Sequence, residues 1–206
     1  MKYNFNCKLY LVTDRDMLKD IDLYTAIEQA IIGGVTLVQL REKNLTSLEL
    51  YNTALQIKKI TDAYDVPLII NDRLDIMMAV NAAGVHLGQK DIPAKAARKL
   101  IGDSKILGVS TSTVEEAILA QQEGADYIGV GALFGTATKS NTRPVTVELL
   151  KQIKQSVSIP VVAIGGIKAT NIGLLKSANI DGVAVVSDIL AKEYIKSAAQ
   201  EIRKLL

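Results

Sequence analysis

The chain has 206 residues, 49% of them hydrophobic, which is enough to bury one substantial core but short for two full domains. Lys and Arg number 24 against 22 for Asp and Glu, so the net charge of +2 creates no global field that favours nucleic acid or an anionic membrane. The single Cys7 allows no internal disulfide, no secretory signal pattern opens the chain, and no apolar run approaches the ~18 residues of a membrane span. We therefore expect one cytoplasmic domain over residues 1–206 that binds small molecules, with the oligomeric state left open, a homo-oligomer included.

Short apolar, β-branched runs bounded by Gly, Pro or Asp alternate with longer helical patterns along the whole chain. The expected strands are 8–13, 36–40, 68–70, 84–87, 106–109, 127–130, 161–164 and 183–186. The expected helices are 23–32, 47–63, 74–82, 94–100, 114–123, 147–155, 169–177 and 194–205. This alternation predicts an α/β fold with a parallel sheet, and eight uninterrupted units favour a (β/α)8 TIM barrel. An open doubly wound sheet is the alternative.

Glycine recurs where an expected helix leads into the next strand. Gly34, Gly84, Gly124 and Gly182 all occupy such positions. A left-handed residue commonly ends a helix, and glycine adopts that conformation without steric cost. We therefore expect these glycines to have positive φ.

The second expected strand is followed by a polar, cationic sequence. In barrels of this kind the chemistry lies at the carboxyl ends of the strands. Gln39, Arg41 and Lys43 alternate, so they share one face if the strand persists. An amide and two cations on one face suit a diphosphate. The alternative is a solvated turn in which Glu42 pairs with these cations.

Two carboxylates follow the next two strands. Asp72 comes after the third strand and Asp91 after the fourth. Carboxylates near phosphate are the hard oxygen ligands that Mg²⁺ binds while it keeps several waters, so we predict a magnesium site. The alternative is that both residues cap the helices that follow, as Asn and Asp commonly do.

Phosphate-binding features are expected after the last three strands. Gly165-Gly166 follows the seventh strand and Val186-Ser187 the eighth, in the two loops that often hold a phosphate in such barrels; ordinary tight turns are the alternative. The segment 131–143 lacks helical periodicity and carries Thr136, Thr138 and Lys139, so it is a candidate lid, with a flexible surface excursion as the alternative. The sole histidine, His86, lies inside a strand and is expected to be structural, without a catalytic role.

The order of these motifs resembles one enzyme family over essentially the whole chain. The matching stretches are 10–14, 38–43, 70–73, 84–89 with Asp91, 108–110, 124–127, 136–139, 164–167 and 185–187. In this order they are similar to the thiamine phosphate synthase (thiamine-phosphate pyrophosphorylase) family. The resemblance implies a transferase of thiamine biosynthesis that joins 4-amino-2-methyl-5-(diphosphooxymethyl)pyrimidine to 4-methyl-5-(2-phosphoethyl)thiazole. The products are thiamine phosphate and pyrophosphate, Mg²⁺ is the cofactor, and some members use a carboxylated thiazole.

The resemblance also implies roles for individual residues. The pyrimidine diphosphate would contact Gln39, Arg41, Lys43, Asn71, Ser110 and Lys139, of which Lys139, Arg41 and Ser110 would be catalytic. The thiazole phosphate would contact Thr136, Thr138, Gly166, Val186 and Ser187, and Mg²⁺ would bind Asp72 and Asp91. The implied mechanism is dissociative: the diphosphate leaves first, and the thiazole nitrogen captures the pyrimidine cation. The sequence departs from the family at 131–135, where proline and a bulky residue are usual, which predicts a more mobile loop.

Three other functions compete with this prediction. A thiazole tautomerase of similar fold would use a histidine near the end of the fifth strand, where this chain has Ser110. A non-catalytic phosphate-sensing barrel would not require both aspartates together with Arg41 and Lys139. A Schiff-base aldolase would need a buried lysine of lowered pKa inside the barrel, whereas Lys139 lies several residues beyond the sixth strand.

Overall fold

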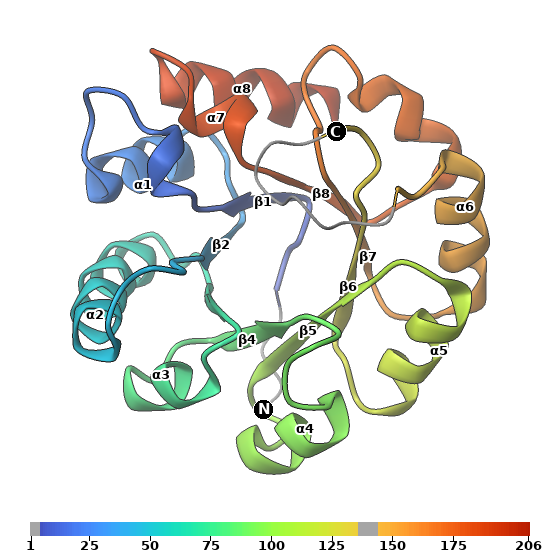
Figure 1. Ribbon diagram of the computed structural model, residues 1–206. Helices are drawn as coiled ribbons and strands as arrows, with labels where there is room; N and C mark the ends of the chain where they lie inside the picture. Colours follow the sequence, from blue (N-terminus) through green and yellow to red (C-terminus); the bar gives the residue numbers. More distant parts are fainter. Residues whose placement is uncertain (1–4, 136–143) are drawn as a thin grey trace.

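Eight parallel strands form a closed barrel in chain order, surrounded by helices (Figure 1). The computed structural model describes residues 5–135 and 144–206. The strands are β1 (Leu9–Val12), β2 (Leu37–Leu40), β3 (Leu68–Asn71), β4 (Gly84–Leu87), β5 (Ile106–Thr111), β6 (Tyr127–Val130), β7 (Val161–Ile164) and β8 (Gly182–Val185). Because β1 pairs with both β2 and β8, the sheet has no free edge. The predicted TIM barrel is confirmed, and the open sheet is excluded.

Helical segments follow the strands and cover the outside of the barrel (Figure 1). The α-helices are α1 (Leu23–Ile32), α2 (Ser47–Ala63), α3 (Leu74–Ala79), α4 (Ala94–Ile101), α5 (Val114–Gln122), α6 (Val147–Ser156), α7 (Ser187–Leu190) and α8 (Ile195–Leu205). Two 3-10 helices are η1 (Arg15–Met17) and η2 (Ile172–Ala178). The last helix packs against the first, so the ring of helices also closes.

The segment after β7 differs from its prediction. An α-helix was expected over 169–177, but the structure has the 3-10 helix η2 there. Gly173 lies within it, and glycine weakens an α-helix interior. Helices η1 and α7 were not predicted because three or four residues are too few to display helical periodicity.

Side-chain caps fix where several helices begin. Asp22 accepts hydrogen bonds from two backbone N–H groups at the start of α1. Thr46 and Glu49 form a reciprocal capping box at the start of α2. Such caps satisfy N–H groups that have no partner inside the helix, so the sequence itself determines these starting points.

The glycine prediction holds at two of four positions. Gly34 and Gly124 have positive φ after α1 and α5, as expected. Gly84 and Gly182 instead lie at the starts of strands, where a Cβ would fall 2.1 Å from Ile106 O in β5 and 1.9 Å from Cys7 O just before β1, respectively. Their glycines are required by close strand contact, so the prediction of positive φ was wrong for them.

The core has two parts separated by the sheet. The larger cluster fills the space between the strands and the helices. A smaller cluster fills the barrel interior and includes Tyr10, Leu37, Ile69 and Tyr127. Successive strand residues point to opposite faces, so strands that are buried on both sides require apolar residues at almost every position.

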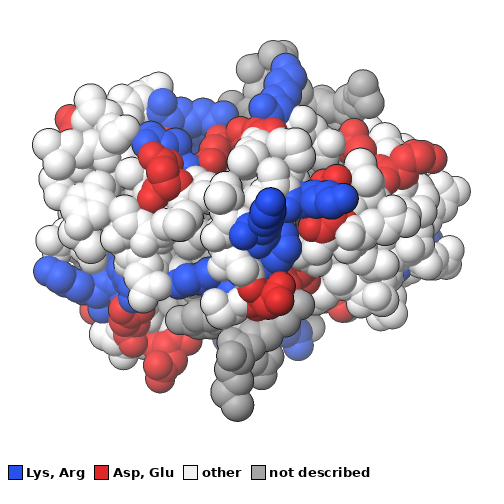
Figure 2. Space-filling view, turned by 90° about the horizontal axis from the view of Figure 1, so that it is seen from below, with Lys and Arg blue, Asp and Glu red and all other residues white. Residues whose placement is uncertain are grey.

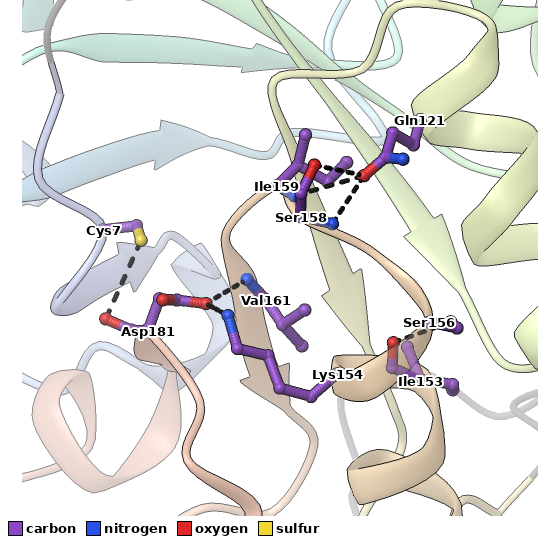
Figure 3. Close-up of polar contacts among 9 residues, drawn as sticks. All are labelled: Cys7, Gln121, Ile153, Lys154, Ser156, Ser158, Ile159, Val161 and Asp181. Atoms are coloured by element: carbon purple, nitrogen blue, oxygen red, sulfur yellow. Dashed lines mark hydrogen bonds and ion pairs between the residues drawn. The ribbon is translucent and has the colours of Figure 1, made fainter.

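Side chains tie the loops together at the amino ends of the strands. Asp181 Oδ2 accepts hydrogen bonds from Val161 N at 2.7 Å and from Lys154 Nζ at 2.6 Å. Gln121 Oε1 accepts from the backbone of Ser158 and Ile159, as Figure 3 shows. These bonds satisfy backbone donors just before β7 and at its first residue, so this end of the barrel has a structural role.

The face of the molecule seen in Figure 2 carries no large patch of one charge sign. On the side seen in Figure 2, basic and acidic side chains are interspersed among uncharged ones. Among the residues that the structure describes, no helix is both long and apolar enough to cross a membrane.

Candidate active site

A hollow opens at the carboxyl ends of the strands. Its empty volume is about 1000 Å³, including the space that is open to solvent. It is lined by the last inward-facing residue of each strand and by the loops after β6, β7 and β8. This is the end of the barrel at which the sequence predicts the chemistry.

Most of the predicted site residues that the structure describes line this hollow. They come from β2, β3, β5 and the loops after β2, β7 and β8, and they are Gln39, Arg41, Asn71, Ser110, Gly166, Val186 and Ser187. Segments as far apart as 39 and 187 in the sequence therefore meet around one cavity. Three further predicted residues, Lys43, Asp72 and Asp91, follow β2, β3 and β4 but do not line the cavity itself.

The cationic sequence after β2 is held by β1 and its loop. Strand β2 ends at Leu40, so the alternation expected through Lys43 does not persist. Arg41 is fixed instead by its backbone N–H, which donates to Thr13 Oγ1 at 2.9 Å, and by Asp14, whose carboxylate lies 3.8 Å from its guanidinium. Glu42 pairs with Arg15 at 3.0 Å, a cation that the solvated-turn alternative did not include.

Asp72 and Asp91 face each other at the rim of the hollow. Neither caps a helix as the alternative proposed, because the N-cap positions of α3 and α4 are Arg73 and Pro93. Asp91 Oδ2 accepts from Gly88 N at 2.6 Å, which holds the loop after β4. Asp72 has a φ of 60°, and its backbone N–H donates to His86 O at 2.9 Å.

The two carboxylates interact closely. Burial and the adjacent Asp91 carboxyl, which shares a hydrogen bond with it, raise the pKa of Asp72 above its ordinary value. Lys43 lies near enough to oppose this rise. Two ionised carboxylates held side by side at a half-buried site repel each other, and a divalent cation bound between them would offset that repulsion. Among the described residues, no cluster has three or more His, Cys, Asp or Glu side chains.

Gly165 and Gly166 fit against the loop after β6. Both have positive φ, 103° and 62°. A Cβ on Gly166 would lie 2.6 Å from Gly135 O and 2.9 Å from Phe134, and a Cβ on Gly165 would lie 2.6 Å from Ala132. Glycine is therefore required at both positions by the close contact with residues 131–135, whether or not a phosphate also binds against this loop.

The loop after β6 is only partly described. Leu133 N donates to Ile164 O at 3.2 Å, and Phe134 N donates to Gly165 O at 3.0 Å, so this stretch is bonded to the end of β7. Thr136, Thr138 and Lys139, and with them most of the predicted lid, lie outside the described residues.

Three polar residues of the cavity wall were not among the predicted site residues. Tyr10, His86 and Tyr127 all contribute to the lining. His86 is buried and bonded through both ring nitrogens, which agrees with its expected structural character, but it also faces the hollow. The alternation of β4 and β6 placed His86 and Tyr127 on the inward face, and that signal could have identified them.

Comparison with known proteins gives consistent results. Residues 9–189 match the family described as thiamine monophosphate synthase. The thiamine-phosphate synthase of Clostridium tetani is 58% identical over 97% of this chain and 95% of its own length. That of Alkaliphilus oremlandii is 56% identical over 98% of both chains. Among solved structures, the thiamine phosphate pyrophosphorylase of Pyrococcus furiosus superposes with a TM-score of 0.88 and 37% identity, covering 96% of this chain and 94% of the other.

Proposed function

The chain belongs to the thiamine monophosphate synthase family, and we propose that the hollow at the carboxyl ends of its strands is where it performs that family's reaction. The enzyme is a transferase of thiamine biosynthesis that joins a hydroxymethylpyrimidine diphosphate to a thiazole phosphate and releases pyrophosphate. The site proposal rests on one observation. The amides of Gln39 and Asn71, the guanidinium of Arg41 and the loop that contains Gly165 and Gly166 all line one cavity. The proposal takes residues 1–206 as one cytoplasmic catalytic domain.

The pyrimidine diphosphate would occupy the side of the hollow formed by β2, β3 and β5. Gln39 and Asn71 offer hydrogen-bonding groups for the ring and its substituents, and Ser110 offers a hydroxyl that can donate to the diphosphate. Arg41, braced by Asp14, offers a forked guanidinium to the diphosphate, and Lys43 adds a cation near Asp72. We include Lys139 in this group from the motif alone, since it lies outside the described residues.

Asp72 and Asp91 are proposed to hold Mg²⁺. The ion commonly takes one or two carboxylates and completes its shell with phosphate oxygens and water, and a facing pair of carboxylates suits that preference. When bound, Mg²⁺ would offset the charge that grows on the departing diphosphate. The Gly88 N–H, by bonding Asp91, keeps that carboxylate directed toward Asp72.

The thiazole phosphate would occupy the opposite side, against Gly166, Val186 and Ser187. Asn171 braces this loop, because its Nδ2 donates to Gly166 O at 2.9 Å and its Oδ1 accepts from Lys168 N at 2.8 Å. Asp188 accepts from Ala169 N at 2.8 Å and joins the loops after β7 and β8. Thr136 and Thr138 are assigned to this phosphate from the motif alone.

The residues of the site support a reaction without a protein nucleophile. Cys7, the only cysteine, is buried, and burial raises the pKa of its thiol to about 11. We propose a dissociative path in which cationic residues stabilise the leaving diphosphate while the cavity wall holds the pyrimidine in register with the thiazole. The apolar part of the wall, formed by Val12, Val162 and Ile164, would offer no hydrogen bonds to water beside the reacting groups.

The decisive test supplies both substrates with Mg²⁺ and measures thiamine phosphate and pyrophosphate together. Equal amounts of the two products are expected. Isomerisation of the thiazole alone would favour the tautomerase, and binding of phosphorylated ligands without turnover would favour a phosphate sensor. Borohydride trapping of a lysine adduct would support the aldolase instead.

A further inference from the structure

Five side chains that line the hollow form one hydrogen-bonded series across the barrel. Gln39 Nε2 donates to Tyr10 Oη at 2.7 Å, and the Tyr10 and Tyr127 hydroxyls lie 2.8 Å apart. The Tyr127 hydroxyl lies 2.9 Å from His86 Nδ1, and His86 Nε2 lies 2.8 Å from Ser110 Oγ. We refer to these residues as the polar network. Its two ends, Gln39 and Ser110, are residues proposed to contact the pyrimidine diphosphate.

The barrel interior is shaped to hold the polar network. A Cβ on Gly108 would lie 2.2 Å from the Tyr127 ring, and one on Gly129 would lie 3.2 Å from His86 Cε1. Tyr10 and Tyr127 are each 1% exposed. Burial raises the pKa of both phenols well above the ordinary value, so each remains a neutral hydroxyl with one hydrogen to donate.

One hydrogen per hydroxyl gives the polar network a direction. When Gln39 Nε2 donates to Tyr10, the Tyr10 hydroxyl donates onward to Tyr127, its other partner among the described residues. Tyr127 then donates to Nδ1 of His86, so the neutral imidazole carries its hydrogen on Nε2 and donates to Ser110 Oγ. Ser110 keeps its own hydroxyl hydrogen for the hollow.

The opposite direction requires the Gln39 amide to turn round. Its Oε1 would then accept from Tyr10, every donor in the network would reverse, and Ser110 would give its hydrogen to His86. In the first direction, or order of donors, Gln39 presents an acceptor to the hollow and Ser110 presents a donor. In the second order the hollow meets a donor at Gln39 and only lone pairs at Ser110.

The substrate chemistry distinguishes these two orders. A diphosphate offers only acceptors, so Ser110 can assist it only as a donor. Placed against Gln39, an amino group at position 4 of the pyrimidine is a donor and requires an acceptor there. We infer that the polar network, acting through neutral His86, couples its two ends and thereby selects a 4-aminopyrimidine over a 4-oxopyrimidine diphosphate. This inference rests on the proposed function, and it makes His86, Tyr10 and Tyr127 positioning residues.

The tautomer of His86 can be read directly, because the chain has one histidine. Protein labelled with ¹⁵N-histidine is saturated with the pyrimidine diphosphate and Mg²⁺, without thiazole phosphate, and its imidazole nitrogens are observed by NMR. Hydrogen on Nε2 and none on Nδ1 is the expected result. Hydrogen on Nδ1, alone or together with Nε2, would overturn the inference.

The selectivity is tested by cutting the network without altering its ends. Tyr127→Phe and Tyr10→Phe each remove one linking hydroxyl and keep the ring. Each variant should lower the ratio of kcat/KM for the natural diphosphate over its 4-oxo analogue by roughly tenfold, the value of about one hydrogen bond. Tyr64→Phe is the matched control, since it removes a surface hydroxyl bonded to Glu28 and should leave the ratio unchanged.

The possible results separate the inference from the proposed function. Circular dichroism and a melting curve first establish that each variant is folded; if one is not, the other still cuts the network. A folded, active variant with an unchanged ratio would show that the hydroxyls serve stability alone, and the inference would fail while the synthase activity stands. Absence of any turnover by the parent enzyme would remove the proposed function and this inference with it.

Discussion

The two ends of the barrel use charged side chains differently. At the amino end, Asp126 Oδ2 accepts from Leu107 N at 2.8 Å and pairs with Arg98 at 2.5 Å. Asp181 likewise accepts from one backbone N–H, that of Val161, and from one cation, Lys154. Each carboxylate there meets a backbone donor and a cation. At the carboxyl end, Asp72 and Asp91 instead face each other. The first arrangement stabilises the fold, whereas the second sets two carboxyl groups against each other and raises the pKa of Asp72.

The largest effect is expected from Asp126→Asn. The carboxylate side chain is 3% exposed and its partner Arg98 15% exposed, so the substitution leaves a largely buried guanidinium without its counter-charge. The free energy of unfolding should fall by about 3 kcal/mol. Chemical denaturation measures this loss. The kcat of the folded fraction should stay within about twofold of the parent, and a large loss of kcat would contradict the division between the two ends.

Asp72→Asn should have the complementary effect at the other end. Removing one metal-binding charge should reduce kcat by well over an order of magnitude, with partial rescue by excess Mg²⁺. The matched control is Asp181→Asn, which also removes a carboxylate but lies at the amino end. Steady-state kinetics over a Mg²⁺ titration check both. Full activity of Asp72→Asn after chelator treatment would show that the metal site is assigned wrongly.

A smaller effect should distinguish the side-chain amides of Asn171 and Gln121, which hold loops at opposite ends of the barrel. Asn171→Ala removes the bonds to Gly166 O and Lys168 N and should raise the KM for thiazole phosphate about fivefold, since a bond of this kind contributes ~1 kcal/mol. Gln121→Ala removes equivalent bonds at the amino end and should change stability but neither KM. Equal effects of Asn171→Ala on both substrates would place the thiazole phosphate elsewhere.

Asn171 is a better probe of this loop than Gly166. A side chain at Gly166 would collide with Phe134 and Gly135, and its φ is positive, so a Gly166→Val variant would disturb the neighbouring loop as well as any bound phosphate. A loss of activity in that variant would therefore not identify the cause.

The smallest effect concerns stability against pH in the absence of metal. The pKa of Asp72 is raised in the folded state, so the folded protein holds this proton more tightly than the unfolded chain. Ionisation of Asp72 therefore reduces stability as pH rises above its unfolded pKa of about 3.9, until the raised folded pKa is passed. Asp72→Asn should flatten this part of the Tm profile. Melting curves measured without Mg²⁺ test it, and an identical profile in the variant would contradict the carboxylate repulsion.

Much of the fold and part of the site could be predicted from local patterns. The eight strands and most helices follow from apolar runs, caps such as Thr46 with Glu49, and breaks at glycine, because each of these acts within a few residues. The rule that parallel strands place chemistry at their carboxyl ends then located Asn71, Ser110 and Ser187 near one another.

The elements and the charged groups at their ends depend on neighbours along the chain, so the amino-acid sequence is enough to predict them. Which distant groups meet depends on how the chain packs in three dimensions. Closure of β1 against β8, the contact of Gly166 with Phe134, and the bond between Tyr10 and Tyr127 each join residues far apart in sequence. The polar network exists because barrel closure directs side chains of five strands into one interior, where each hydroxyl must find a partner.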